Sequence, residues 1–258
     1  MEKKKHKMKD KIKKMPQMSV IKFEGSNFSK YQRRIVGSDS FKELIKHEML
    51  ISLFGDLPGS AGLFLRKAFY RRLFQNVGKN VTFGKSIAVR HPTKIIINDS
   101  TIIDDFCVLD SKSERDPGII IGKRCLIGRN TTVSTGYKGY VKIGSNVIVG
   151  ANSLLQGPGG IDIGDNVLMG DQIILNAGKH IYSSTNIPII EQGITMEGIV
   201  INDDVWIGAG AIVTDGVTIS KGAVIEAGSV VNMNIPEYAI AAGTPAKVIT
   251  FRNQICSL

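Results

Sequence analysis

The sequence has few cysteines, and they lack the spacing of a metal site or a disulfide framework. Its 258 residues contain Cys107, Cys125 and Cys256, with no CxxC pair and no Cys/His cluster. An odd, unpatterned cysteine count is typical of a reduced intracellular protein. We therefore expect a cytoplasmic protein that requires no metal.

Long hydrophobic runs are also missing. No stretch of 18 apolar residues is present, so the sequence predicts no membrane-spanning helix. The first residues, MEKKKHKMKDKIKKM, lack the apolar segment of a signal peptide. Hydrophobic residues still make up 43% of the chain, which is enough for a sizeable core.

Positive charge is concentrated at the start of the chain. Residues 1–16 carry eight lysines against Glu2 and Asp10, which gives +6 of the total net charge of +10. No aromatic residues alternate with these lysines, so nucleic acid is disfavoured as a partner. We expect residues 1–37 to form a solvated, disordered tail, with contact to anionic lipid headgroups as the alternative.

Residues 38–79 are predicted to form a short helical segment. Ser40 and Glu43 fit a capping box before a helix with Phe41, Leu44, Ile45 and Met49 on one face. After a break at residues 55–59, LFLRKAFYRRLF suggests a second helix with a Leu65, Phe69 and Leu73 stripe flanked by arginines and Lys67. These helices are expected to pack on the end of the next domain. The alternative is a peripheral contact with the inner membrane surface.

From about residue 81 an aliphatic residue recurs every six positions. The clearest run is INDDVW, IGAGAI, VTDGVT, ISKGAV, IEAGSV and VNMNIP, residues 201–236. A period of six fits neither a helix nor an alternating strand, but it fits a short strand followed by a turn. Three such hexads close one coil, and coils stack about 4.8 Å apart. The lead aliphatic would point inward, and the fifth position would hold a small or slim residue. Cys107 and Cys125 occupy fifth positions three hexads apart, so we expect stacked core residues.

This pattern resembles the hexapeptide-repeat acyltransferases, whose fold is the left-handed parallel β-helix. The resemblance covers roughly residues 80–250 and includes the closing stretch YAIAAGTPAKVI. It implies a mainly β fold with a short helical N-terminal segment, a C-terminal tail at 251–258, and a homotrimer with active sites between subunits.

The repeat is interrupted once, at residues 178–198. A solenoid has no pocket of its own, so chemistry must use an interruption or a groove between subunits. In the enzymes that this chain resembles, such a loop carries the catalytic histidine near its start, and His180 matches that position. Imidazole can accept a proton near neutral pH, so His180 is predicted to be a general base. Ile181 follows it where relatives often have an acidic residue. A backbone carbonyl, Glu191 or Asp171 remains open as the group that orients the ring.

The resemblance also implies the donor site, because the family binds acetyl-CoA in a groove between two prisms. By position, Ala209 and Ala227 would be the small residues against which the pantetheine lies. Trp206 would line the thioester or be buried between subunits. Lys247 and Arg252 would meet the phosphates.

The function predicted from these features is acetyl transfer from acetyl-CoA to a hydroxyl of a sugar or polysaccharide precursor. Transfer would be direct, with His180 as the base. An acetyltransferase acting on serine or an antibiotic, and a non-catalytic β-helix scaffold, remain as alternatives. Binding of acetyl-CoA separates the scaffold from the enzymes. Neither the acceptor nor the choice between O- and N-acetylation can be read from the sequence.

Overall fold

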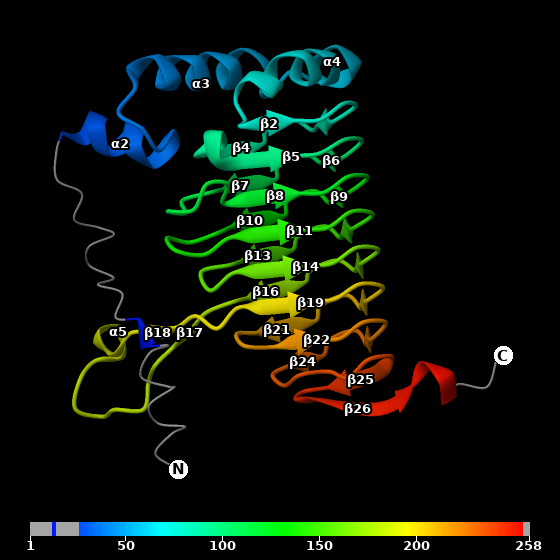
Figure 1. Cartoon of the computed structure of the whole chain (residues 1–258). Helices are drawn as coiled ribbons and strands as arrows, with labels where there is room; N and C mark the ends of the chain where they lie inside the picture. Colours follow the sequence, from blue (N-terminus) through cyan, green and yellow to red (C-terminus); the bar gives the residue numbers. More distant parts are fainter. Residues whose placement is uncertain (1–11, 14–25, 255–258) are drawn as a thin grey trace.

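Three parallel sheets form the faces of a triangular prism in the computed structural model of the chain (Figure 1). The structure describes residues 12–13 and 26–254. Each turn of the chain contributes one strand to each sheet in a fixed order, so the repeating unit is a coil with three corners. The expected mainly β fold, a parallel β-helix with a short helical N-terminal segment, is confirmed.

The three sheets share the strands as follows. The first sheet contains β2 (Asn76–Val77), β5 (Ile95–Ile97), β8 (Ile119–Ile121), β11 (Val141–Ile143), β14 (Ile161–Ile163), β19 (Ile199–Ile201) and β22 (Thr218–Ile219). The second contains β3 (Thr82–Phe83), β6 (Ile102–Ile103), β9 (Leu126–Ile127), β12 (Ile148–Val149), β15 (Leu168–Met169), β20 (Trp206–Ile207), β23 (Val224–Ile225), β25 (Ala239–Gly243) and the antiparallel β26 (Ala246–Phe251). The third contains β4 (Ala88–Arg90), β7 (Val108–Asp110), β10 (Thr132–Ser134), β13 (Leu154–Gln156), β16 (Ile174–Asn176), β21 (Ile212–Thr214) and β24 (Val230–Val231).

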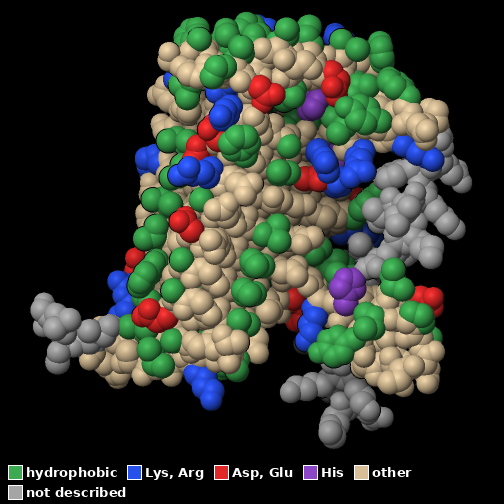
Figure 2. All heavy atoms as spheres, turned by 180° about the vertical axis from the view of Figure 1, so that it is seen from behind, with side chains coloured by type: hydrophobic (Ala, Val, Ile, Leu, Met, Phe, Trp, Pro, Cys, Tyr) green, Lys and Arg blue, Asp and Glu red, His purple; other side chains and the backbone are tan. Residues whose placement is uncertain are grey.

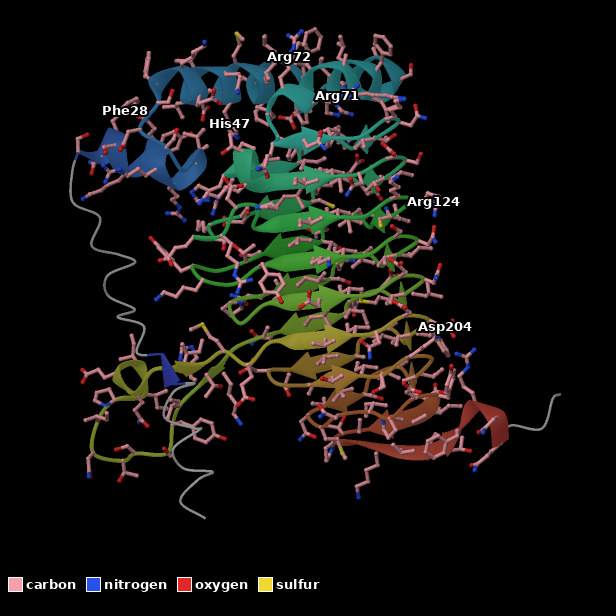
Figure 3. The ribbon with its side chains drawn as sticks, in the orientation of Figure 1. Phe28, His47, Arg71, Arg72, Arg124 and Asp204 are labelled. Atoms are coloured by element: carbon pink, nitrogen blue, oxygen red, sulfur yellow. The ribbon has the colours of Figure 1, made fainter. Side chains whose placement is uncertain are left out.

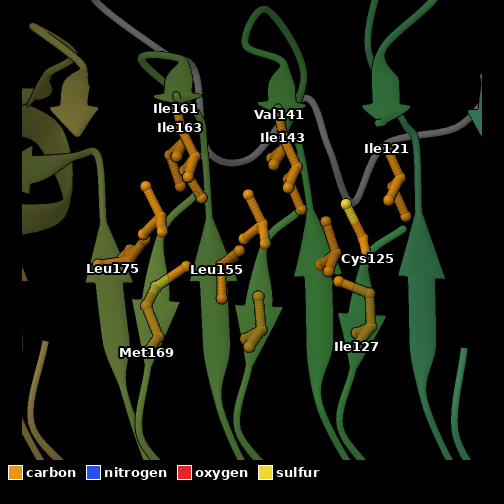
Figure 4. Close-up of a cluster of buried hydrophobic side chains, with 14 of the residues drawn as sticks. Ile121, Cys125, Ile127, Val141, Ile143, Leu155, Ile161, Ile163, Met169 and Leu175 are labelled. Atoms are coloured by element: carbon orange, nitrogen blue, oxygen red, sulfur yellow. The ribbon is translucent and has the colours of Figure 1, made fainter. Parts of the chain in front are cut away.

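Aliphatic side chains fill the prism. In the first sheet Ile121 pairs with Ile143, which pairs with Ile163, and all three are buried. Figure 4 shows these side chains meeting Leu155, Leu175 and Met169 from the other faces. Full burial of such a side chain stabilises the fold by about 1.5–3 kcal/mol. Because the repeat places one aliphatic residue of every hexad inside the prism, this gain recurs on each side of each coil and specifies the solenoid.

The two described cysteines are buried in this core but do not stack on each other. Cys107 lies at the corner between the second and third sheets, where its carbonyl accepts the amide of Ala88. Cys125 lies at the corner between the first and second sheets, where its carbonyl accepts the amide of Ile102. The expectation of stacking is wrong because the early coils are longer than three hexads, as the pairing of Ile95 with Ile119 shows.

Helices cover the N-terminal end of the prism. Helix α3 (Phe41–Phe54) and α4 (Gly59–Phe69) lie across it, followed by a short 3-10 turn, η2 (Tyr70–Arg72) (Figure 1). Ser40 caps α3 as predicted, because its Oγ accepts the amide of Glu43. The predicted capping box is only half formed, because the Ser40 amide donates to Ser38 Oγ and not to the Glu43 side chain. His47 Nε2 contacts the carbonyl oxygen of Val89 at 3.0 Å, which joins α3 to the first coils (Figure 3).

Two details of the expected helical segment are wrong. Leu44 is buried, but Phe41, Ile45 and Met49 are exposed, because α3 packs on the prism through Leu44, His47 and Leu50. Arg66 does not flank an apolar stripe at the surface. It is buried and donates hydrogen bonds to the carbonyl oxygens of Phe83, Phe54 and Leu57, so it fastens α4 to β3.

The predicted tail at residues 1–37 is also wrong in part. Residues 27–35 form helix α2 (Asn27–Ile35), whose N-terminus is capped by Ser26 Oγ. Residues 12–13 form the short strand β1 (Ile12–Lys13). Residues 1–11 and 14–25, and 255–258 of the expected C-terminal tail, lie outside the described residues. Within the described part of the chain, no helix has the length and hydropathy needed to cross a membrane.

Candidate active site

The chain leaves the prism after β16 and rejoins it at β19, and the residues between form a projecting loop (Figure 1). At its base, β17 (Lys179–His180) pairs antiparallel with β18 (Ile194–Thr195). The backbone of β1 pairs with the other edge of β18. A one-turn helix, α5 (Ile189–Gln192), precedes β18 and lies beside it (Figure 1). The loop is therefore held by its own small sheet.

Asp215 fixes this base to the next coil. Its Oδ1 accepts the amides of Glu197 and Gly198, both at 2.9 Å, and its Oδ2 accepts the hydroxyl of Thr195 at 3.0 Å. Sequence reasoning did not identify Asp215. The only available signal was an acidic residue at the corner that follows the interruption.

His180 lies at the end of β17, opposite Ile194 of β18, with its side chain exposed. The adjacent amide, of Ile181, donates to the carbonyl oxygen of Gly193 at 3.0 Å. The backbone on both sides of the histidine is thus held by strand pairing. The side chain of His180 therefore extends from a fixed backbone position at the root of the loop.

Buried Gln192 shapes the outer part of the loop. Its amide nitrogen donates to the carbonyl oxygens of Ser184 and Ile187, and its Oε1 accepts the amide of Ser184. The loop nevertheless leaves several large apolar side chains exposed, namely Tyr182, Ile187, Ile189 and Ile190. An apolar tip on a projecting loop is suited to contact with another chain or a ligand.

Ala209 and Ala227 lie one above the other at the corner between the second and third sheets, which we call the alanine edge. The amide of Gly228 donates to the carbonyl oxygen of Ala209 at 2.9 Å, and both alanines are exposed. A Cβ on Gly208 would lie 2.5 Å from the amide nitrogen of Ala227, so the backbones of successive coils approach closely here. Small residues therefore follow one another along the edge at Gly208, Ala209, Ala227 and Gly228.

Trp206 points outward from the second sheet and is 43% exposed. It is in register with Leu168 of the preceding coil and Val224 of the following coil. Together with Ile102 and Ile148 at equivalent outward positions, Trp206 and Leu168 form an exposed apolar stripe on this face. We call it the second-sheet stripe.

Lys247 lies near the start of β26, and Arg252 follows its end as the first residue of the 3-10 turn η4 (Arg252–Gln254). Lys247 is exposed and pairs with Ala242, next to the turn whose Thr244 hydroxyl contacts the carbonyl oxygen of Gly228. Lys247 therefore belongs to the alanine edge. Arg252 is about 16 Å further along, given a strand rise of roughly 3.3 Å per residue. Its Nη1 donates to Asp204 Oδ2 at 2.9 Å and to the carbonyl oxygen of Gly222 (Asp204 is labelled in Figure 3).

The structure thus brings together Ala209, Ala227 and Lys247, with Trp206 on the adjoining face. It does not bring Arg252 to the alanine edge. His180 belongs to a different corner, between the third and first sheets, so the width of the third sheet separates it from that edge. One chain alone does not place the histidine against the expected cofactor groove.

The two candidate carboxylates differ in position. Asp171 lies at the alanine edge, where its Oδ1 accepts the amide of Ala151 at 2.7 Å. That corner is not the one from which the loop projects. Glu191 lies in α5 within the loop and is exposed. Among the described residues, no group of three or more His, Cys, Asp or Glu side chains is arranged to hold a metal ion.

Comparison with known proteins finds one matching repeat model and several similar transferases. The family model for the hexapeptide repeat of succinyl-transferase matches residues 118–136, 140–178 and 198–232. A Mycobacterium tuberculosis protein named a probable acetyltransferase is 36% identical over 51% of this chain and 44% of its own length. The galactoside O-acetyltransferase of Lactococcus lactis is 33% identical over 50% of this chain and 60% of its own length. The chain therefore matches about half the length of these relatives.

The solved structure of AntD, an N-acyltransferase from Bacillus cereus in complex with dTDP and 3-hydroxybutyryl-CoA, superposes with a TM-score of 0.53. It is 25% identical, and the alignment covers 72% of this chain and 88% of AntD. The chain thus contains the hexapeptide repeat over these segments, and it is similar to proteins named acetyltransferases and acyltransferases.

Proposed function

We propose that the protein is an acetyl-CoA-dependent O-acetyltransferase that modifies a hydroxyl group of a sugar. Two relatives named galactoside O-acetyltransferase, from Lactococcus lactis and Escherichia coli, support the class of acceptor. The acyl-CoA bound to AntD supports the class of donor.

The observation that carries this proposal is the division of the site between two corners. His180 is exposed at the root of a loop, and the alanine edge is exposed across the third sheet. A second chain would complete the site if its alanine edge faced the first chain's loop. The second-sheet stripe and the apolar loop tip supply surfaces for such packing. Closed threefold symmetry, which the resemblance to hexapeptide-repeat acyltransferases implies, would give a homotrimer with three equivalent sites.

In the proposed reaction His180 removes the proton from the acceptor hydroxyl as its oxygen attacks the thioester carbonyl. The tetrahedral intermediate collapses, the carbon–sulfur bond breaks, and the CoA thiolate leaves. The proton held by His180 is then available to the thiolate. Trp206 would lie beside the thioester, and Lys247 would meet a phosphate of CoA. The acetyl group passes directly from CoA to the acceptor, so no covalent intermediate with the enzyme forms.

N-acylation of an amino sugar is the second candidate, because AntD is an N-acyltransferase that has been solved with dTDP-4-amino-4,6-dideoxyglucose and coenzyme A. The same base and donor site would serve an amine acceptor. The two candidates differ only in the acceptor atom, so a matched pair of sugars with a hydroxyl or an amine at the same carbon separates them.

The first test is calorimetry of acetyl-CoA binding, with desulfo-CoA and ATP as comparison ligands. Binding in the micromolar range, with one site per chain and much weaker ATP binding, is expected. Transfer is then followed by release of free CoA thiol in the presence of candidate sugars. Absence of acetyl-CoA binding to a folded oligomer would contradict the proposed function and favour a non-catalytic scaffold.

A further inference from the structure

A pocket of about 800 Å³ lies where helix α2 meets the first coils. It is lined by α2 and by three successive corners between the third and first sheets, which contribute His91 and Lys94, then Lys112 to Glu114, then Tyr137. The loop with His180 leaves the same edge two coils further on, after β16. At about 4.8 Å per coil, that is roughly 10 Å beyond the last corner of the pocket. The pocket is therefore distinct from the alanine edge and from the loop.

The lining is strongly basic. Its cationic residues are Lys30, Arg33, Arg34, Lys94 and Lys112, and its one anionic residue is Glu114. Five positive charges against one negative charge leave +4 around one opening. Figure 2 shows Lys and Arg side chains gathered below the helices on the side from which the loop projects.

Part of this charge is already matched within the chain. Arg33 pairs with Asp39 at 2.8 Å, and Lys112 pairs with Asp110 at 2.8 Å. Lys94 Nζ donates to the carbonyl oxygen of Ser113, which is a neutral acceptor. The described residues place no carboxylate within ion-pair distance of Lys30, Arg34 or Lys94. The positive charges of these three side chains are therefore not neutralised by an ion pair and can attract an anionic ligand.

His91 holds the pocket in shape. Its amide donates to the carbonyl oxygen of Ile35 at 2.7 Å, and its Nε2 lies 2.8 Å from the carbonyl oxygen of Arg33. These bonds dock the C-terminal end of α2 on the first coil. Gly37 follows the helix with φ +74°, and a Cβ there would lie 2.1 Å from Cδ2 of His91. The fit between helix and coil therefore depends on glycine at this position.

One lining residue of the pocket, His91, carries a buried polar atom without a hydrogen-bond partner among the described residues, its Nδ1. This atom lies 3.9 Å from Oδ1 of Asp110, which is also buried without a hydrogen-bond partner and does not line the pocket. Buried polar groups normally have partners, so a water molecule fits between these two atoms. The volume is within the usual range for a small-molecule site, and Tyr31 and Tyr137 add aromatic surface to the lining.

We propose that this pocket binds the phosphate group of a small phosphorylated ligand, at a site separate from acyl transfer. A phosphate or diphosphate suits the set of donors, because guanidinium and ammonium groups form short, charge-assisted hydrogen bonds to its oxygens. Arg34 and Lys30 bind it from α2, and Lys94 binds it from the solenoid. The size of the pocket leaves room for a sugar or base attached to the phosphate.

Inorganic pyrophosphate is the probe for the test, measured by calorimetry on the full chain without CoA, because the phosphates of CoA would compete for this pocket. The measurement is repeated on the Lys247→Gln variant, in which any phosphate site on the alanine edge is weakened. We expect one saturable site per chain. Lys30→Gln and Arg34→Gln should each weaken binding by about tenfold, the usual effect of losing a charged hydrogen bond. Lys138→Gln removes an exposed charge near Tyr137 that does not line the pocket, and it should change binding by less than about twofold.

A second variant tests the architecture without removing a charge. Gly37→Ala should displace the end of α2 and abolish pyrophosphate binding, while the main thermal transition of the solenoid is retained. Unchanged affinity in Gly37→Ala would overturn the role of the docked helix. Equal losses in Lys138→Gln and Arg34→Gln would show diffuse attraction rather than a site. Binding to phosphatidylglycerol vesicles without any binding of pyrophosphate would overturn the proposal for a soluble ligand.

Discussion

Asp215 holds Gly198 at the point where the loop rejoins the solenoid, with Oδ1 accepting the Gly198 amide at 2.9 Å. The same carboxylate also holds the amide of Glu197 and the hydroxyl of Thr195. One side chain from the next coil thus fixes the strand that pairs with His180. The position of the proposed base depends on a residue outside the loop.

Replacing Asp215 should loosen the loop while leaving the prism intact. In Asp215→Ala three hydrogen bonds to a carboxylate are lost, and we expect faster amide hydrogen exchange at residues 194–198. The local loss should be on the order of 1–3 kcal/mol. Transfer activity should fall while acetyl-CoA affinity is retained. Asp215→Asn keeps an acceptor oxygen and should show a smaller effect. Unchanged exchange in both variants would contradict the anchoring role.

His180→Ala should lower kcat by about 100- to 10,000-fold, the range that general base catalysis contributes. Acetyl-CoA affinity should stay within about twofold, because the alanine edge, Trp206 and Lys247 hold the donor in this account, whereas the histidine acts on the acceptor hydroxyl. Release of CoA thiol measures the rate, and calorimetry measures the affinity. Asn186→Ala, an exposed substitution in the same loop, is the matched control and should keep full activity. A His180→Ala enzyme with wild-type kcat would rule out this base.

A bulky side chain on the alanine edge should block the donor. Ala227 is exposed one coil beyond Ala209, so Ala227→Trp adds volume to the groove without disturbing the core. We expect acetyl-CoA affinity to fall at least about tenfold with an unchanged melting temperature. Asn202→Leu adds an apolar side chain at another exposed corner and should leave the affinity unchanged. If Ala227→Trp binds acetyl-CoA normally, the donor lies elsewhere.

The core thiols should be unreactive in the native protein. Burial raises the pKa of the Cys107 thiol to about 11 and also raises the pKa of the Cys125 thiol. The thiolate is the reactive form, and it is scarce below the raised pKa. In a Cys256→Ser background, a chromogenic disulfide reagent at pH 8 should therefore detect no thiol before denaturation and two thiols after it. Rapid reaction of one thiol in the native state would show that the prism opens there.

The sequence predicts the solenoid well because every side of every coil has the same requirement, one aliphatic residue that points inward. An inward aliphatic residue every six positions needs no knowledge of distant contacts, and parallel pairing follows from stacking equal turns. The prediction fails where coils change length. Cys107 and Cys125 are three hexads apart in the sequence, but the early coils are extended at a corner, so the two side chains occupy different corners.

The candidate site was predicted from the sequence only in part. His180 and the two alanines occupy the expected elements, because the resemblance fixes them relative to the repeat. The position of Arg252 depends on how β26 turns back on β25, and its partner Asp204 is 48 residues away, so the period carries no information about it. Tertiary contacts, which no local sequence pattern predicts, determine the roles of Asp215 and Arg66 and the presence of the pocket beside α2.

The central claim is that His180 of one chain serves the alanine edge of another, and subunit complementation tests it most directly. His180→Ala and Ala227→Trp chains are purified separately, then unfolded and refolded together in equal amounts. Each variant alone should be nearly inactive. Random mixed trimers should recover about a quarter of wild-type activity, because one of three interfaces in each mixed trimer pairs an intact histidine with an intact groove. Mixed trimers that remain inactive, while wild-type chains refold to full activity, would show that each site is built within a single chain and would contradict the account.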